Sequence, residues 1–249
     1  MKLMLSTGSV AGHGTEKTMQ LASKLGFDGV EIIMPVRGPS PGEVRAMRKK
    51  HGFSCMNVHM PFLKSVLPLG LLSPDPAKKM LERAVAWAGE ACAEKLVVHP
   101  FPAIFMRKKF SAAMADVLPS CNMRFCVENM EPRVFGTFPY CLRSPAELRK
   151  FAEENDTGIT FDTAHCMKYG RNPAEMLAEL GQHVENIHLS GFRRGMCHME
   201  LFSNMETFTE LFSYLKKAKY RGRLVLEIMP SGEEDIKKNV AFVKNSLGF

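Results

Sequence analysis

Eight short apolar segments alternate with helical patterns along the chain, and this alternation is the feature that most restricts the fold. Strands that alternate with helices form parallel sheets. Eight such units in 249 residues predict an α/β protein with one domain over residues 1–249, a closed (β/α)8 TIM barrel. An open doubly wound sheet is the alternative. The expected strands are residues 2–7, 29–35, 55–62, 95–101, 124–130, 158–165, 184–192 and 222–230.

The segments between these strands carry recognisable helix signals. Residues 40–52 and 144–155 each begin with Ser-Pro and place a glutamate in the first turn, which is typical of a helix start. Residues 73–93 and 204–220 repeat apolar side chains at helical spacing. No linker or low-complexity segment divides the chain, so the sequence predicts one domain.

Composition restricts the class of protein further. No run of 18 apolar residues is present, so we expect no membrane span and no membrane partner. Seven cysteines without a CxxC pair indicate reduced thiols and a cytoplasmic location. The net charge of +7 favours anionic partners such as phosphates or nucleic acid.

The phase of the strands indicates which side chains share the barrel interior. Alternate residues of a strand face opposite sides, so Asp162 and Thr160 point inward if Ile159 and Phe161 face the helices. The same phase places an acidic or imidazole side chain inside, near the C-terminal end, in seven strands. Barrel enzymes assemble their sites at this end. The seven residues are Glu31, His59, His99, Glu128, Asp162, His188 and Glu227.

Buried carboxylates and imidazoles gathered in one place need a compensating partner. Each alone has an ordinary structural interpretation, such as a hydrogen-bonded histidine or a solvated glutamate. Together, bare carboxylates would repel one another and imidazoles would stay unsatisfied, and divalent cations resolve both problems. Mixed nitrogen and oxygen ligands suit zinc, manganese, iron or cobalt. His165, three residues after Asp162, is a further ligand candidate.

Several short motifs carry a resemblance to a known superfamily. They are GFDGVEI (26–32), VHMPF (58–62), VVHP (97–100), VEN (127–129), FDTAH (161–165), IHLS (187–190) and LVLEI (224–228). In this order and spacing, the chain resembles the xylose-isomerase-like barrels over essentially its full length. That superfamily contains sugar and sugar-phosphate isomerases and epimerases, and also endonuclease IV.

The resemblance implies three groups of metal ligands. The first zinc of endonuclease IV corresponds to His59, His99 and Glu128. The central metal, which the isomerases share, corresponds to Glu128, Asp162, His188 and Glu227. Two ligands of a third zinc correspond to His165 and His198, but Met196 stands where that site takes an aspartate. We therefore expect one or two divalent ions, zinc or manganese.

Two classes of enzyme and one binding function follow from these residues. In the first, an isomerase or epimerase of a small sugar or sugar phosphate works through an enediolate, with Glu128 and Glu227 as the acid/base pair. Glu31 favours this class, because isomerase-like relatives commonly carry DGVE. His165 would then meet substrate or a metal-bound water. Further candidates for contact with substrate are His13, Lys168, Arg193 and Arg194. The alternative is that these four are ordinary charged side chains of loops, in contact with solvent only.

The second possibility is an apurinic-site DNA endonuclease using two or three zinc ions. His59 and His99 favour it, and so do Phe62 and Leu63, which stand where the nuclease pries the duplex open. The basic chain would also suit a phosphate backbone. Met196 and the missing G-x-G turn stand against it. The third possibility is a barrel that only binds a metal or a sugar.

Overall fold

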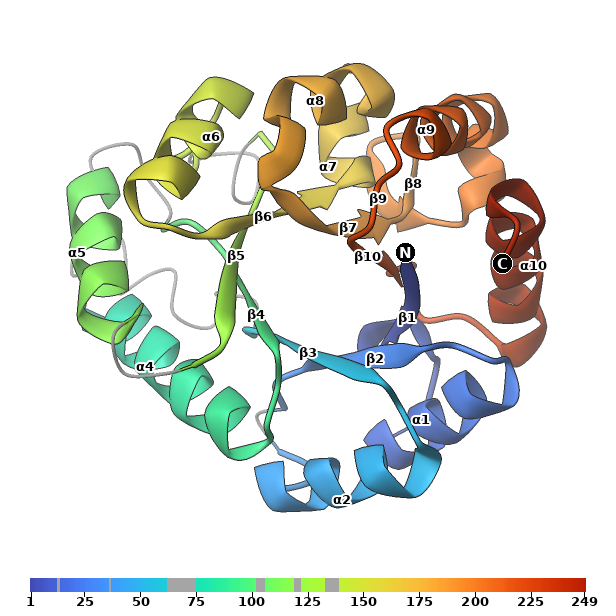
Figure 1. Cartoon of the computed structure of the whole chain (residues 1–249), viewed down its shortest axis with the longest axis horizontal. Coiled ribbons are helices and arrows are strands. Elements are labelled where there is room, and N and C mark those ends of the chain that lie inside the picture. Colours follow the sequence, from blue (N-terminus) through green and yellow to red (C-terminus); the bar gives the residue numbers. More distant parts are fainter. Residues whose placement is uncertain (13, 36, 62–74, 102–105, 119–121, 133–138) are drawn as a thin grey trace.

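Eight parallel strands close into a barrel around the centre of the molecule (Figure 1). The structure is a computed structural model that describes residues 1–12, 14–35, 37–61, 75–101, 106–118, 122–132 and 139–249. Around the barrel the order is β1-β10-β7-β6-β5-β4-β3-β2, so β1 pairs with β10 and closes the sheet. The strands are β1 (Lys2–Ser6), β2 (Gly29–Ile33), β3 (Cys55–His59), β4 (Lys95–Val98), β5 (Arg124–Glu128), β6 (Gly158–Asp162), β7 (Val184–Leu189) and β10 (Arg223–Leu226).

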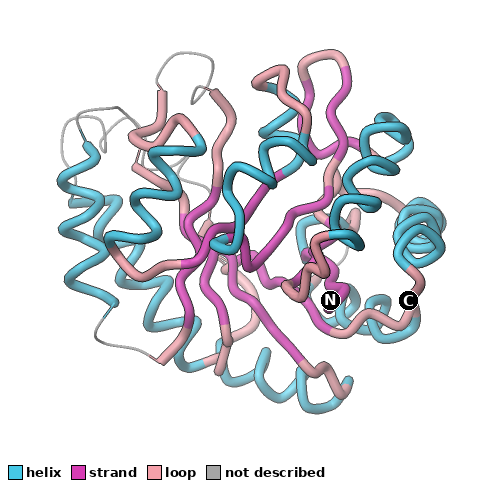
Figure 2. The backbone as a smooth tube through the Cα atoms, turned by 45° about the horizontal axis from the view of Figure 1, so that its top comes forward, coloured by secondary structure: helices cyan, strands magenta, loops and turns pink. Residues whose placement is uncertain are grey.

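Helices surround the strands, as Figure 2 shows in cyan around the magenta centre. Both Ser-Pro starts are confirmed: Ser40 and Ser144 form capping boxes with Glu43 and Glu147. The helices are α1 (Thr15–Lys24), α2 (Pro41–His51), α4 (Asp75–Glu90), α5 (Arg107–Val117), α6 (Pro145–Glu154), α7 (Thr163–Lys168), α8 (Pro173–Leu180), α9 (Met205–Lys217) and α10 (Glu233–Leu247). The prediction of a (β/α)8 TIM barrel is confirmed.

The core has two parts because each strand has two faces. Outward side chains such as Ile159 and Phe161 join the large apolar layer between strands and helices. Inside the barrel, Met4, Cys55 and Val225 form a small apolar cluster. The rest of the interior carries many buried polar side chains. Burying such groups is costly unless they find partners, so the barrel interior is where function is expected.

Several strands end earlier than the sequence predicted, and two of these ends shape the site. The expected strand 158–165 stops at Asp162, because the Asp162 carboxylate accepts the backbone N–H of His165 and caps α7. The expected strand 184–192 stops at Leu189. The chain then forms an antiparallel hairpin of β8 (Gly191–Arg193) and β9 (Met196–Met199), which the sequence did not predict.

Candidate metal centre

Seven polar side chains from seven consecutive barrel strands or the residue just after them converge inside the barrel. Six of them are buried, and the Glu227 side chain is 12% exposed. The structure thus brings together the whole set expected from the strand phase, which is Glu31, His59, His99, Glu128, Asp162, His188 and Glu227. Apart from Glu31, which is the middle residue of β2, each lies at or near the C-terminal end of its strand, where a barrel builds its site.

His59, His99 and Glu128 form the first group of possible ligands. Glu128 Oε2 lies 3.2 Å from His59 Nε2 and 3.1 Å from His99 Nε2. The Nδ1–H of His59 donates to the backbone carbonyl of Met60 at 2.7 Å, which leaves Nε2 directed at Glu128. The three side chains are close enough to hold one ion.

The central group consists of Glu128, Asp162, His188 and Glu227. His188 Nδ1 lies 2.7 Å from Glu227 Oε2 and 3.5 Å from Glu128 Oε1. Among the described residues, His188 Nδ1 and Glu227 Oε2 are both buried without a hydrogen-bond partner. Three carboxylates and an imidazole with orphaned atoms suit a divalent cation, so the residues fit the metal that the sequence implies.

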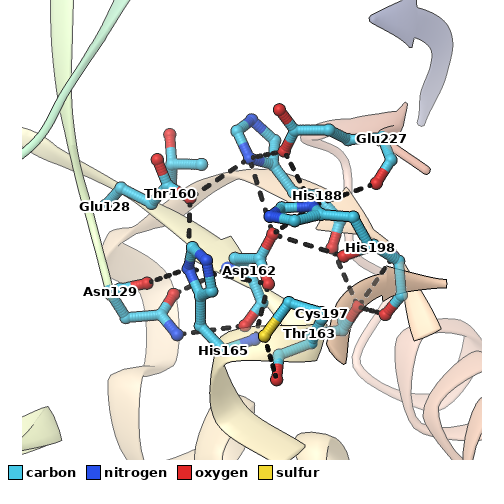
Figure 3. Close-up of polar contacts among 12 residues, drawn as sticks. Glu128, Asn129, Thr160, Asp162, Thr163, His165, His188, Cys197, His198 and Glu227 are labelled. Atoms are coloured by element: carbon cyan, nitrogen blue, oxygen red, sulfur yellow. Dashed lines mark hydrogen bonds and ion pairs between the residues drawn. The ribbon is translucent and has the colours of Figure 1, made fainter. Parts of the chain in front are cut away.

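Asp162, His165 and His198 form a third group beside the central one (Figure 3). Asn129 organises it: its side chain accepts the N–H of Asp162, and its backbone carbonyl accepts from His165 Nδ1 at 2.9 Å. Asn129 was not among the residues to which a role was assigned from the sequence, although it stands in the VEN motif. Met196 lies on β9 with half of its surface exposed.

The charges of the cluster shift its pKa values in opposite directions. Burial lowers the pKa of His59, but the hydrogen bond and charge of Glu128 outweigh it and raise the value to about 9. For His99 burial dominates, and its pKa falls below the ordinary value. Burial raises the pKa of Glu128 and Glu227, but His188 and its neighbours outweigh this; the pKa of Glu128 lies well below the usual range and that of Glu227 is about 2.

These shifts predict that metal binding strengthens as the pH rises. The charged form of His59 stabilises the metal-free protein below pH 6.5, and this contribution disappears as the pH rises through the folded-state pKa of about 9. A cation needs the neutral imidazole, so the binding of a cation displaces a proton. The affinity for the cation therefore rises by up to about tenfold per pH unit for each proton displaced. Glu227 stays ionised throughout, since its pKa is about 2.

The measurement is the thermal shift caused by Mn²⁺ at a series of pH values between about 6 and 9. The shift should grow with pH, and calorimetry in buffers of different ionisation enthalpy should detect proton release. A thermal shift of the same size at every pH would contradict the charged state assigned to His59.

With this geometry established, comparison with known proteins identifies the family. A model of the xylose isomerase-like TIM barrel family matches residues 19–246. The chain belongs to this family. An uncharacterized protein from Mycobacterium leprae (strain TN) is 27% identical, and the match covers 100% of this chain and 96% of that protein.

Solved structures of other proteins share the fold. A D-tagatose 3-epimerase-like protein superposes with a TM-score of 0.77 at 20% identity, covering 100% of this chain and 97% of the other. Endonuclease IV from Thermus thermophilus superposes with a TM-score of 0.74, also at 20% identity, covering 100% and 99%. These two likenesses show that this chain shares their barrel fold.

The remaining candidates for contact with substrate or DNA around the mouth of this xylose isomerase-like barrel differ in their surroundings. Lys168 is paired with Glu131. Arg193 and Arg194 are exposed at the turn of the β8–β9 hairpin. His13, Phe62 and Leu63 lie outside the described residues. A cavity of about 130 Å³ opens onto the cluster and is lined by Ile33, His59, His99, Glu128, Met130, His165, His198 and Glu227.

Glu31 was also a sequence-based candidate for contact with substrate. Its carboxylate is fully buried and faces His188, Asn57 and Asn186. Within the described part of the chain, no helix is long and apolar enough to cross a bilayer.

Proposed function

We propose that the protein is a metal-dependent isomerase or epimerase of a small sugar or sugar phosphate. The observation that carries this proposal is the central group, in which Glu128 and Glu227 flank the same interior space from β5 and the end of β10. Two strands, β6 and β7, separate them around the barrel. The epimerases among the solved neighbours support the same class.

Glu128, Asp162, His188 and Glu227 would hold the central divalent cation. When bound, such a cation polarises a carbonyl and stabilises the negative charge of an enediolate. His59 and His99, with Glu128, could hold a second ion or face the substrate directly. The small cavity and the buried histidines beside it restrict the site to a compact polar substrate.

The two glutamates would move the substrate proton. Both have lowered pKa values, so both begin as carboxylates, the form that removes a proton from carbon. In an isomerisation, one glutamate takes the proton and returns it to the neighbouring carbon, while the hydroxyl proton passes from one of the two substrate oxygens to the other. In an epimerisation, the second glutamate first takes up a proton from solvent and then gives it to the opposite face of the carbon. The first glutamate afterwards releases the proton that it removed to solvent, so both groups end as carboxylates.

The test is proton exchange at substrate carbon. A panel of small aldoses, ketoses and their phosphates is incubated in D₂O with the Mn²⁺-loaded protein, and NMR follows deuterium entering the carbon beside the carbonyl. An isomerase or epimerase incorporates deuterium and forms the new sugar. Binding of a sugar without exchange would indicate instead a barrel that only binds its ligand.

The second candidate function is an apurinic-site endonuclease. The specific observation in its favour is the group of His59, His99 and Glu128, which a single-metal epimerase does not need. The third group, of Asp162, His165 and His198, lacks the aspartate of a complete third zinc site, since Met196 occupies that sequence position. Nicking of abasic duplex DNA separates the two candidates.

A further inference from the structure

Glu31 lies beneath the metal centre and contacts it through His188. Its Oε1 atom is 2.9 Å from His188 Nε2, and both side chains are fully buried. Neither of these two atoms makes a hydrogen bond to a described residue, so in this structure they form a close contact without hydrogen-bond geometry. The opposite nitrogen, His188 Nδ1, faces Glu227 and Glu128. Glu31 and the central ligands therefore occupy the two sides of one imidazole ring.

The other oxygen of Glu31 is already occupied. Oε2 accepts the Nδ2–H groups of Asn57 at 2.9 Å and of Asn186 at 3.2 Å. A carboxylate oxygen with two donors is well satisfied. Oε1 is thus the atom that Glu31 can offer to His188.

The orientation of the Asn57 side-chain amide is fixed by Arg223, at the N-terminal side of the barrel. Arg223 donates to Asn57 Oδ1, and a guanidinium has donors only. Asn57 must therefore turn its amide NH₂ toward Glu31. Arg223 is itself held by Glu94 Oε2 at 3.2 Å, at the N-terminal side of the barrel. The hydrogen bonds in this series therefore all donate toward Glu31: Arg223 donates to Asn57, and Asn57 donates to Glu31.

This fixed direction determines which nitrogen of His188 carries a proton. A neutral imidazole has one donor and one acceptor nitrogen, and an ionised carboxylate can only accept. When a cation is bound among the carboxylates on the Nδ1 side, Oε1 of Glu31 at Nε2 keeps the proton on Nε2 and leaves the Nδ1 lone pair for the cation. Nδ1 is the nitrogen that faces the other three central ligands. Partners of this kind commonly tune the affinity of a metal site.

We propose that Glu31 is a positioning residue that selects Nδ1 of His188 as the metal-binding atom. This proposal rests on the proposed function of the central group as a metal centre. It also gives Glu31 a role that does not require contact with substrate.

The variant Glu31→Gln tests the direction of the hydrogen bonds. The oxygen of the introduced amide stays with the two donors from Asn57 and Asn186, so its NH₂ group faces His188 Nε2. The ring must then accept at Nε2 and carry its proton on Nδ1, which opposes the cation. We expect the affinity for Zn²⁺ to fall about 10- to 100-fold at the site containing His188.

Glu185→Gln is the matched control. Glu185 lies on the same strand as His188 but binds Lys95 at 2.6 Å and Arg124 at 2.8 Å, away from the ring. This variant should bind Zn²⁺ like the unmodified protein. An equal loss of Zn²⁺ affinity in Glu31→Gln and Glu185→Gln would indicate a general loss of stability and would overturn the role given to Glu31.

The double variant Glu31→Gln with Asn57→Asp tests the same direction by reversing it. The carboxylate introduced at position 57 still accepts from Arg223 and can now accept the NH₂ introduced at position 31, while Asn186 turns its amide over. The amide oxygen at position 31 then faces His188 Nε2, and Zn²⁺ affinity should recover in part. A folded double variant that binds as weakly as Glu31→Gln would overturn the proposal.

A measurement on the unmodified protein does not depend on any variant folding. The protein is labelled with ¹⁵N-histidine and loaded with Zn²⁺, and long-range ¹H–¹⁵N correlation spectra report each ring nitrogen. A protonated Nε2 and a zinc-bound Nδ1 at His188 support the proposal, and zinc on Nε2 overturns it. If the unmodified protein binds no Zn²⁺, the metal centre itself fails, which is a separate result from a failure of Glu31.

Discussion

Replacing Glu227 with glutamine is expected to lower metal content and to reduce kcat/KM by at least about 10³-fold. Glu227 has a buried oxygen without a hydrogen-bond partner among the described residues, 2.7 Å from His188 Nδ1. An amide keeps the size of the side chain but cannot supply the negative charge that a cation needs. It also cannot take a proton from carbon. One substitution therefore removes a ligand and half of the proposed acid/base pair.

The measurement combines metal analysis with the D₂O exchange assay on purified Glu227→Gln. Glu185→Gln serves as the control, because it is the same substitution in another partly buried carboxylate of the barrel. That control should keep both metal and turnover. Normal metal content and turnover in Glu227→Gln would remove Glu227 from the proposed site.

The alternation of strand and helix segments was sufficient to predict the fold, and the alternation of side chains along each strand was sufficient to predict the contents of the barrel. Leu224 and Leu226 belong to the outer apolar layer, while Val225 lies inside, as the phase requires. A parallel barrel buries both faces of every strand, so a polar residue within an apolar run stands out. This is why seven interior residues could be named without knowledge of the chain path.

The features that the sequence did not predict depend on contacts between distant segments. Asp162 ends its strand because its own carboxylate caps the next helix, and Asn129 from the neighbouring strand holds its backbone. The position of Glu31 beneath His188 follows from the closure of the sheet, which brings β2 and β7 together across the interior. Local patterns carry no information about such contacts.

The natural protein is expected to bind no third zinc ion tightly and to cleave abasic DNA only at background rate. Met196 is half exposed on β9 and offers a neutral, soft thioether where the nuclease-type site takes a carboxylate. Asp162 and the two histidines of the third group would then hold an ion with too few anionic ligands. Because the resemblance implies three ions for the nuclease reaction, the missing charge is expected to cost several kcal/mol, about 10²-fold or more in rate.

The variant Met196→Asp restores a carboxylate at this position and should bind about one more equivalent of Zn²⁺ than the natural protein. Met205→Asp is the matched control, since Met205 is exposed to a similar extent but begins α9. Zinc stoichiometry and nicking of an abasic duplex are measured for all three proteins. An isomerase or epimerase needs no third ion, so the rate of deuterium exchange at the sugar carbon should be the same in Met196→Asp as in the natural protein. Three tightly bound zinc ions and efficient nicking by the natural protein would instead establish the endonuclease and refute the isomerase.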